Sequence, residues 1–397
     1  MKPSIKAAAA SLLSLSLCAA FSAQAADVKM YGIIDTGIIV ENNKMGTEES
    51  STWAREEFGV NLGPRIGLIA TEKVNEDLTV RMQLENLFES DNGAMRFNRL
   101  WGGESSLAVQ SRYGELAFGR VGALTSPFGR WGVYGLEATP FGNGWGRSGG
   151  VHHVAGMADR VDNAISYASP DFDGWKMFGQ FSFQTGSNPT PGVEQSKWKH
   201  NTRRGALALR FKNEQFTAIA VVEQIWNTEG LANADFGEDT TIASAAVNFL
   251  TVPSVRLFLM GQYLKNVYNA PGTPVHSAAK LLGAGLNTAT NPTGIEGRGF
   301  DGFNVGVNAQ IKLWGGDLYL TTGYNDWEYK GDVVEGQETG LKHYLVGAAY
   351  EYPLSKRVHI YGSANWTHGT GLFDTENFSD SSDPNSWQAM AGLTYFF

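Results

Sequence analysis

The stretch LTVRMQLENLF, residues 78–88, alternates apolar and polar side chains. Arg81, Gln83 and Glu85 share one face, because successive side chains of a strand point to opposite sides, and leucine, valine and methionine fill the other face. Three neighbouring charged or amide groups on one face are costly against a dry core. They are readily accommodated against a water-filled lumen, so the stretch favours a pore-forming β-barrel over a soluble sandwich.

The same alternation recurs along the whole chain, and short connections alternate with long polar ones, such as residues 42–54. We therefore predict an all-β, antiparallel transmembrane barrel of about sixteen strands, with short turns on one rim and long loops on the other. The candidate strands cover approximately residues 28–40, 65–71, 78–88, 102–111, 113–121, 160–169, 175–184, 204–211, 216–226, 240–250, 255–265, 301–313, 318–327, 341–352, 358–367 and 386–397.

Residues 121–159 form a connection that is dense in glycine and aromatic residues and lacks strand-like alternation. A connection this long is usually functional or disordered. The aromatic residues Trp131, Tyr134 and Trp145 argue against disorder, because they carry enough apolar surface to hold a glycine-rich backbone against other parts of the chain. We predict that this segment folds into the barrel lumen; the alternative is an ordinary surface loop.

The N-terminal residues 1–25 are typical of a secretory signal peptide, with Lys2 and Lys6, an apolar stretch and the small-residue sequence Ala-Gln-Ala at 23–25. The remaining residues, 26–397, would form the barrel and contain no cysteine. Removing the two lysines leaves 29 basic and 40 acidic residues, a net charge of −11. This excess of acid opposes nucleic-acid or anionic-lipid binding as a main role.

Several short motifs together resemble those of a known family, and the resemblance covers essentially the whole chain. They resemble the general diffusion porins of Gram-negative bacteria, in particular the branch found in beta-proteobacteria and neisseriae. The motifs are VKMYGIIDTG at 28–37, Arg65-Ile66-Gly67, Thr71-Glu72, Gly119-Arg120, DNAISYASPDF at 162–172, and Phe397.

The resemblance implies a homotrimer of sixteen-stranded barrels in the outer membrane, passing small hydrophilic solutes and ions. In that family the third external loop folds inward, and a cluster of wall arginines faces a carboxylate on this loop. By position, Arg65, Arg120 and Arg160 match the wall arginines, and Glu137 is the available carboxylate. Phe397 resembles the terminal residue that the outer-membrane assembly machinery recognises.

The chain departs from the family pattern in two places. The pair Asn98-Arg99 lies earlier than the resemblance implies. The inward loop also carries Arg130 and Arg147, which make its net charge positive. We therefore expect a net basic constriction with a mild preference for anions. Arg81, Gln83, Glu85 and Arg204 are expected to line the lumen more generally.

Other sites have weaker signals. His152 and His153 are adjacent, so their side chains point apart on an extended chain, and no metal site or cofactor is predicted. No nucleophile motif accompanies the seven scattered histidines, and we predict no enzyme. Acidic clusters in the long loops are either solvated or hold Ca²⁺ or Mg²⁺, between subunits or to the lipopolysaccharide of the outer-membrane lipid. Two other functions remain open: a channel selective for carboxylates or sugars, and an adhesin or structural anchor.

Overall fold

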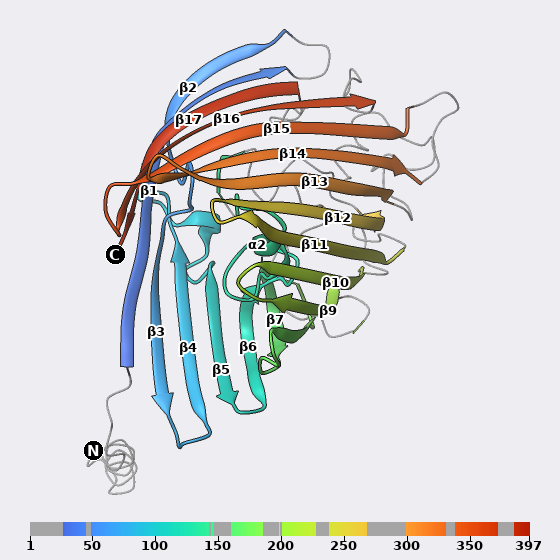
Figure 1. Ribbon diagram of the computed structural model, residues 1–397. Helices are drawn as coiled ribbons and strands as arrows, with labels where there is room; N and C mark the ends of the chain where they lie inside the picture. Colours follow the sequence, from blue (N-terminus) through green and yellow to red (C-terminus); the bar gives the residue numbers. More distant parts are fainter. Residues whose placement is uncertain are drawn as a thin grey trace, which may run out of the picture.

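The computed structural model describes residues 27–44, 49–142, 144–146, 160–185, 198, 201–227, 238–267, 299–330, 338–371 and 385–397. These residues form one antiparallel sheet of seventeen strands (Figure 1). The strands are β1 (Asp27–Lys44), β2 (Ser51–Phe58), β3 (Arg65–Lys73), β4 (Thr79–Leu87), β5 (Glu104–Ser111), β6 (Gly114–Gly122), β7 (Arg160–Ala168), β8 (Trp175–Ser182), β9 (Arg203–Lys212), β10 (Phe216–Trp226), β11 (Thr240–Val252), β12 (Val255–Val267), β13 (Phe300–Leu313), β14 (Gly316–Tyr329), β15 (Gly340–Pro353), β16 (Val358–Gly371) and β17 (Asn385–Phe396).

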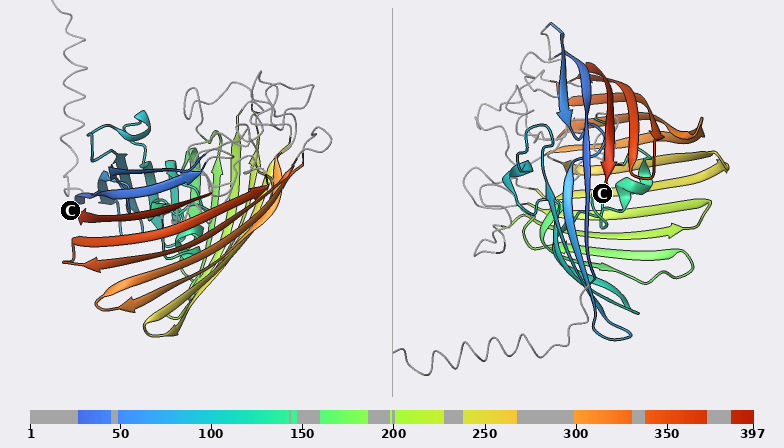
Figure 2. Two further views of the ribbon diagram at one scale, coloured as in Figure 1. Left: turned by 90° about the horizontal axis from the view of Figure 1, so that it is seen from above. Right: turned by 90° about the vertical axis from the view of Figure 1, so that its left-hand side faces the viewer.

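The sheet closes on itself through β1. Residues 33–44 of β1 pair with β17, and residues 27–33 pair with β3. Residues 36–43 of β1 also pair with β2. Strands β2 and β3 therefore follow one another along β1 and together occupy one position in the barrel. The barrel therefore has sixteen strand positions, which confirms the prediction, and Figure 2 shows the strands curving around it.

Strand β2 was missed by the prediction, which had a polar loop over residues 42–54. The structure instead continues β1 to Lys44 and pairs it with β2 from Thr36↔Phe58 to Asn43↔Ser51. Most β2 side chains are exposed on both faces, so the hairpin has no alternation of apolar and polar residues. Backbone hydrogen bonding alone defines this strand, and a pattern of side chains does not reveal it.

Burial in the wall is the reverse of that in a soluble protein. In β13, Asn304 and Asn308 are buried, whereas Val305 and Val307 are exposed. Such alternation, apolar toward lipid and polar toward the lumen, is characteristic of an outer-membrane barrel.

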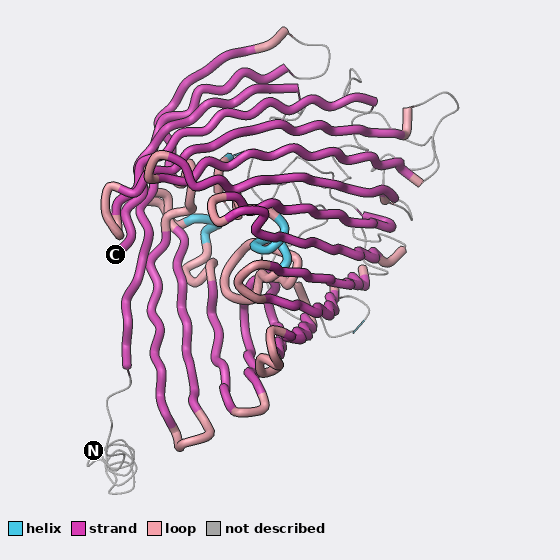
Figure 3. The backbone as a smooth tube through the Cα atoms, viewed as in Figure 1, coloured by secondary structure: helices cyan, strands magenta, loops and turns pink. Residues whose placement is uncertain are grey.

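The described residues contain two short helical segments, η1 (Arg96–Asn98) and α2 (Tyr134–Ala138), shown in cyan in Figure 3. Neither has the length or the apolar character of a membrane-crossing helix, and no other described residue belongs to one. Helix α2 belongs to the connection between β6 and β7, for which no regular structure was predicted. It lies on the concave side of the sheet and contacts β10, β11 and β12 (Figure 1).

Candidate functional site

Residues 123–142 and 144–146, which we call the inner segment, leave the end of β6 and lie on the concave face of the wall. Leu124, Trp131 and Tyr134 form one apolar cluster with side chains of the strands below them. Many of those strand residues are alanines, whose small side chains leave room for a second layer of chain. The alanines are Ala108, Ala117, Ala164, Ala168, Ala206, Ala208 and Ala246.

Hydrogen bonds hold the first part of the inner segment to β9–β12. The Tyr134 hydroxyl donates to the backbone carbonyls of Gly261, at 3.1 Å, and Ala245, at 3.3 Å. Burial raises the pKa of the Tyr134 phenol, so the hydroxyl remains a donor across the physiological range. Thr125 accepts a hydrogen bond from Arg204 at 3.1 Å and donates to Glu223 at 3.3 Å. Arg204 and Glu223 also form a direct ion pair, and both are buried.

The second part of the inner segment reaches strands that are distant from β6 in the ring. Phe141 and Trp145 pack edge to face with ring centroids 6.3 Å apart, and both contact Tyr319 of β14. Trp145 also packs against Tyr361 of β16, at 5.5 Å between centroids. The inner segment therefore starts at β6 and ends against β14 and β16. Arg147 and the rest of the connection to residue 159, including His152 and His153, lie outside the described residues.

Glu137 has a different environment from the one expected. The prediction placed this carboxylate opposite the wall arginines. In the structure its Oε1 is 2.8 Å from Lys212 Nζ and 3.4 Å from Arg210, both on β9. Asn248 of β11 also donates to the backbone oxygen of Glu137 at 2.9 Å. These contacts attach α2 to the wall near the short turn between β9 and β10.

A cluster of six arginines and four carboxylates covers the concave face of β3–β7, and we call it the arginine cluster. Arg160 and Arg65 lie 3.8 and 4.0 Å from the same oxygen of Glu85. Arg120 and Arg99 bind the two oxygens of Asp162 at 2.8 and 2.6 Å. Its members are Arg65, Arg81, Arg99, Arg120, Arg130 and Arg160 with Glu85, Glu104, Glu115 and Asp162.

The cluster also joins the inner segment to the wall. Arg130, on the inner segment, pairs with Glu115 and lies 3.7 Å from Glu104. The Arg160 guanidinium lies over the ring of Phe128, 4.9 Å from its centroid. Arg81 donates to Gln83 at 2.7 Å and interacts electrostatically with Arg130. The structure thus brings together Arg65, Arg120, Arg160 and Arg130, all predicted for one site, and places Arg81, Gln83 and Glu85 beside them.

A β-bulge turns Arg120 toward this cluster. By simple alternation Arg120 would share the exposed face of Phe118. The β6–β7 pairing instead shifts register between Gly119 and Val121, and Gly119 has a φ of 121°. Only glycine fits there, since a Cβ would lie 2.2 Å from the Ser105 carbonyl oxygen. Bulges commonly redirect a side chain in this way.

Sequence reasoning missed four members of the arginine cluster: Arg99, Glu104, Glu115 and Asp162. Two signals were available. Arg99 belongs to the Asn98-Arg99 pair noted above, and Asp162 begins the run 162–172 that carried the resemblance.

The predicted aromatics Trp131, Tyr134 and Trp145 are all nearly fully buried. Among the described residues, no group of three histidines, cysteines or carboxylates is arranged to hold a metal ion.

Phe397 lies at the seam where β17 meets β1. Its backbone N–H donates to the carbonyl of Gly32, and the N–H of Gly32 donates to the Phe397 carbonyl, both at 3.1 Å. The Phe397 ring lies over Gly32, where a Cβ would come within 2.1 Å of it. It also stacks on Tyr395, with ring centroids 6.3 Å apart.

Comparisons with known proteins agree with this architecture. The sequence model of the family described as Gram-negative porin matches residues 7–372. The chain is 25% identical to an outer membrane porin protein of Bordetella pertussis, over 97% of this chain and 99% of that protein. It is 26% identical to a major outer membrane protein P.IB of Neisseria gonorrhoeae, over 90% and 93%. In fold it is similar to an anion-selective porin from Comamonas acidovorans, with a TM-score of 0.64, 18% identity, and 94% and 100% coverage.

Proposed function

Since the chain belongs to the Gram-negative porin family, we propose that it is an outer-membrane channel with a basic constriction and a mild anion preference. Small hydrophilic solutes and ions diffuse passively through its water-filled lumen. The family relation supports a channel and not an enzyme. The proposed anion preference rests on one observation, the arginine cluster on the concave face of β3–β7.

The inner segment narrows the channel in this proposal. Its contacts support this role, because it runs along the concave face from β6 to β14 and β16. Arg130 extends from the inner segment to the arginine cluster, so the narrowest passage lies beside the cluster. Arg147, which lies outside the described residues, is proposed to add to the same positive charge.

The sign of the selectivity follows from the formal charges. Six arginines and four carboxylates leave two net positive charges. One such charge attracts an anion about 6 Å away by roughly 0.7 kcal/mol in water and about 3 kcal/mol at an effective dielectric constant of 20. Salt screens this attraction. The channel therefore favours anions without excluding cations.

The aromatic residues argue against the solute-selective alternative. Such a channel needs exposed rings on which a solute can stack. Trp131, Tyr134 and Trp145 are instead packed against the wall, with 2%, 0% and 4% of their surface exposed. Their role here is to hold the inner segment in place.

The decisive test is the double variant R65Q/R120Q in a planar lipid bilayer under a KCl gradient. We expect the ratio of chloride to potassium permeability to fall by about threefold or more, because two charges leave the constriction. The control K356Q/R357Q removes two charges from the exposed turn between β15 and β16 and should leave the ratio unchanged. If R65Q/R120Q and the control had equal reversal potentials, the arginine cluster would not lie at the constriction.

Four further features are proposed, the first from the sequence of residues 1–25 and the other three from the family relation. Residues 1–25 act as a secretory signal, which mass spectrometry of the purified protein would show as an N-terminus at Ala26. The channel assembles as a homotrimer, measurable by light scattering of the detergent complex. Phe397 serves recognition by the outer-membrane assembly machinery, and the surrounding lipid includes lipopolysaccharide.

A further inference from the structure

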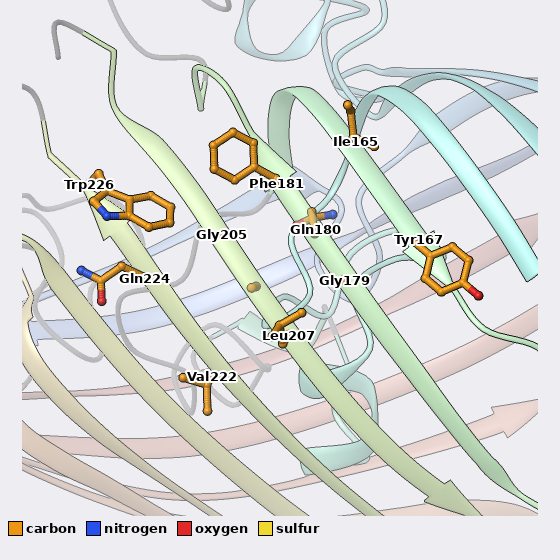
Figure 4. A pocket seen from close by; sticks show the side chains of 11 residues that line it. Ile165, Tyr167, Gly179, Gln180, Phe181, Gly205, Leu207, Val222, Gln224 and Trp226 are labelled. Atoms are coloured by element: carbon orange, nitrogen blue, oxygen red, sulfur yellow. The ribbon is translucent and has the colours of Figure 1, made fainter. Parts of the chain in front are cut away.

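A groove of about 600 Å³ runs over the outer face of β7–β10 (Figure 4). This face is opposite the inner segment, since the groove residue Leu207 is 71% exposed whereas its neighbours Ala206 and Ala208 are buried beneath the inner segment. The groove is almost entirely apolar. The side chains that form its walls belong to Ile165, Tyr167, Phe181, Leu207, Val222 and Trp226.

Two glycines, Gly179 and Gly205, form the floor of the groove. Gly205 pairs with Phe181 on one side and Gln224 on the other. The Trp226 ring lies against it, since a Cβ on Gly205 would be 3.1 Å from that ring. In Figure 4, the Phe181 and Trp226 rings lie on either side of Gly205. A glycine inside a strand weakens the strand and often marks close approach by another group.

A cation lies at one end of the groove. Arg203 pairs with Trp226 in the ladder and is two residues from Gly205, about 7 Å along the strand. Its guanidinium lies over the rings of Trp198 and Trp226, at 4.7 and 5.8 Å from their centroids. The Nε atom is buried without a hydrogen-bond partner in the described part of the chain. Within that part, no carboxylate is in ion-pair distance of Arg203.

Arg203 lies at the outer rim of the barrel. At this end of the strands, the long connection 183–202 joins β8 to β9, and another long connection, 227–239, follows β10. In outer-membrane barrels the long loops are external. Tryptophans gather at the level of the lipid headgroups, so Trp198 and Trp226 place the guanidinium at that level, with the groove extending from it toward the membrane centre.

We propose that this groove binds an acyl chain of an outer-leaflet lipid, and that Arg203 binds the phosphate of its headgroup. An apolar channel in contact with the bilayer accepts a hydrocarbon chain, and a guanidinium forms charge-assisted hydrogen bonds with phosphate. The proposal rests on the outer-membrane location and is independent of the ion selectivity. It assigns the glycines a function, because any larger side chain at Gly205 would fill the floor.

The test is native mass spectrometry of the folded protein in detergent, titrated with lipid A as the phosphorylated probe. R203Q removes the cation and G205L fills the floor, and each should weaken lipid A binding by about tenfold. R112Q is the matched control for charge, since Arg112 is exposed in the turn on the opposite rim. G261L is the matched control for volume, because a Cβ at Gly261 meets nothing closer than 3.6 Å. Both controls should bind like the parent protein.

Further measurements test whether the groove binds something other than a phosphorylated lipid. A diacylglycerol without phosphate should bind weakly and be insensitive to R203Q, whereas inorganic phosphate alone should not displace lipid A. Displacement by inorganic phosphate would overturn the proposal, and so would unchanged lipid A binding by folded R203Q and G205L. If G205L altered the oligomeric mass and left lipid A binding intact, the groove would be a contact between copies of this chain. Channel selectivity is measured separately and should not change in R203Q, because Arg203 is on the outer face.

Discussion

At the scale of single residues, Asp162 neutralises part of the positive charge of the arginine cluster. Its carboxylate is nearly buried and binds Arg99 and Arg120 with its two oxygens, at 2.6 and 2.8 Å. Charge-assisted hydrogen bonds of this kind are about twice as strong as neutral ones. One carboxylate therefore orients two guanidinium groups and lowers the net positive charge of the cluster.

Replacing Asp162 with asparagine should increase the anion preference. D162N removes one negative charge while keeping a side chain of the same shape, so the cluster gains one net positive charge. The ratio of chloride to potassium permeability should rise by about threefold or more, measured as the reversal potential under a KCl gradient. The exposed turn residue Asp77 supplies the control variant D77N. A ratio equal to that of D77N would mean that Asp162 does not face permeating ions.

At the scale of elements, the inner segment acts as a second layer on the wall. The alanines of β5–β11 leave space for it, and buried hydrogen bonds from Tyr134 and Thr125 fix its position. Its final rings reach β14 and β16. These contacts, spread over several strands, hold the inner segment against the wall.

Shortening the inner segment should increase single-channel conductance. Gly122 and Arg160 are paired neighbours in the β6–β7 ladder, so a short Gly-Ser linker in place of residues 125–150 can still join the two strands. Removing this layer widens the channel, and the conductance in 1 M KCl should rise. The control is a deletion of residues 331–336, in the connection between β14 and β15. Equal conductance in the two deletions would place the inner segment outside the ion path.

At the scale of the whole molecule, closure depends on the seam around β1. Asp35 of β1 is fully buried and accepts hydrogen bonds from the Asn61 N–H at 3.0 Å, from the Tyr361 hydroxyl at 2.8 Å, and from Thr394. These donors come from the connection after β2, from β16 and from β17. Phe397 adds two backbone hydrogen bonds to Gly32 at the same seam. The two ends of the sheet are thus joined by polar contacts as well as by the β1–β17 ladder.

Replacing Phe397 with alanine should reduce the yield of folded barrel. The ring covers Gly32 and stacks on Tyr395, and both contacts lie at the seam where β1 and β17 close the barrel. The measurement is the folded fraction in outer-membrane extracts, by the heat-dependent shift in gel mobility. F397Y retains the ring and is the matched control. A folded fraction for F397A equal to that of F397Y would exclude a role for the ring in assembly.

Much of the barrel wall was predictable from local pattern. The period-two alternation of stretches such as 78–88 depends only on neighbouring residues, and it located the sixteen strands that span the ring. It failed for β2, where apolar and polar residues are mixed on both faces. Charged positions on the lumen side, including Arg65, Arg81 and Glu85, followed from the same alternation and from the resemblance.

The tertiary structure alone decided which of these residues meet. Arg99 and Arg120 share Asp162 across 63 and 42 residues of chain, and Glu137 pairs with Lys212 across 75. Arg120 turns inward only because a bulge at Gly119 interrupts the alternation. The sequence by itself thus determined a porous sixteen-stranded barrel, because alternation is local. The partners of each charge required the folded sheet, which places β3–β7 side by side. The path of the inner segment to β14 and β16 required the closed ring, because only closure brings those strands across from β6.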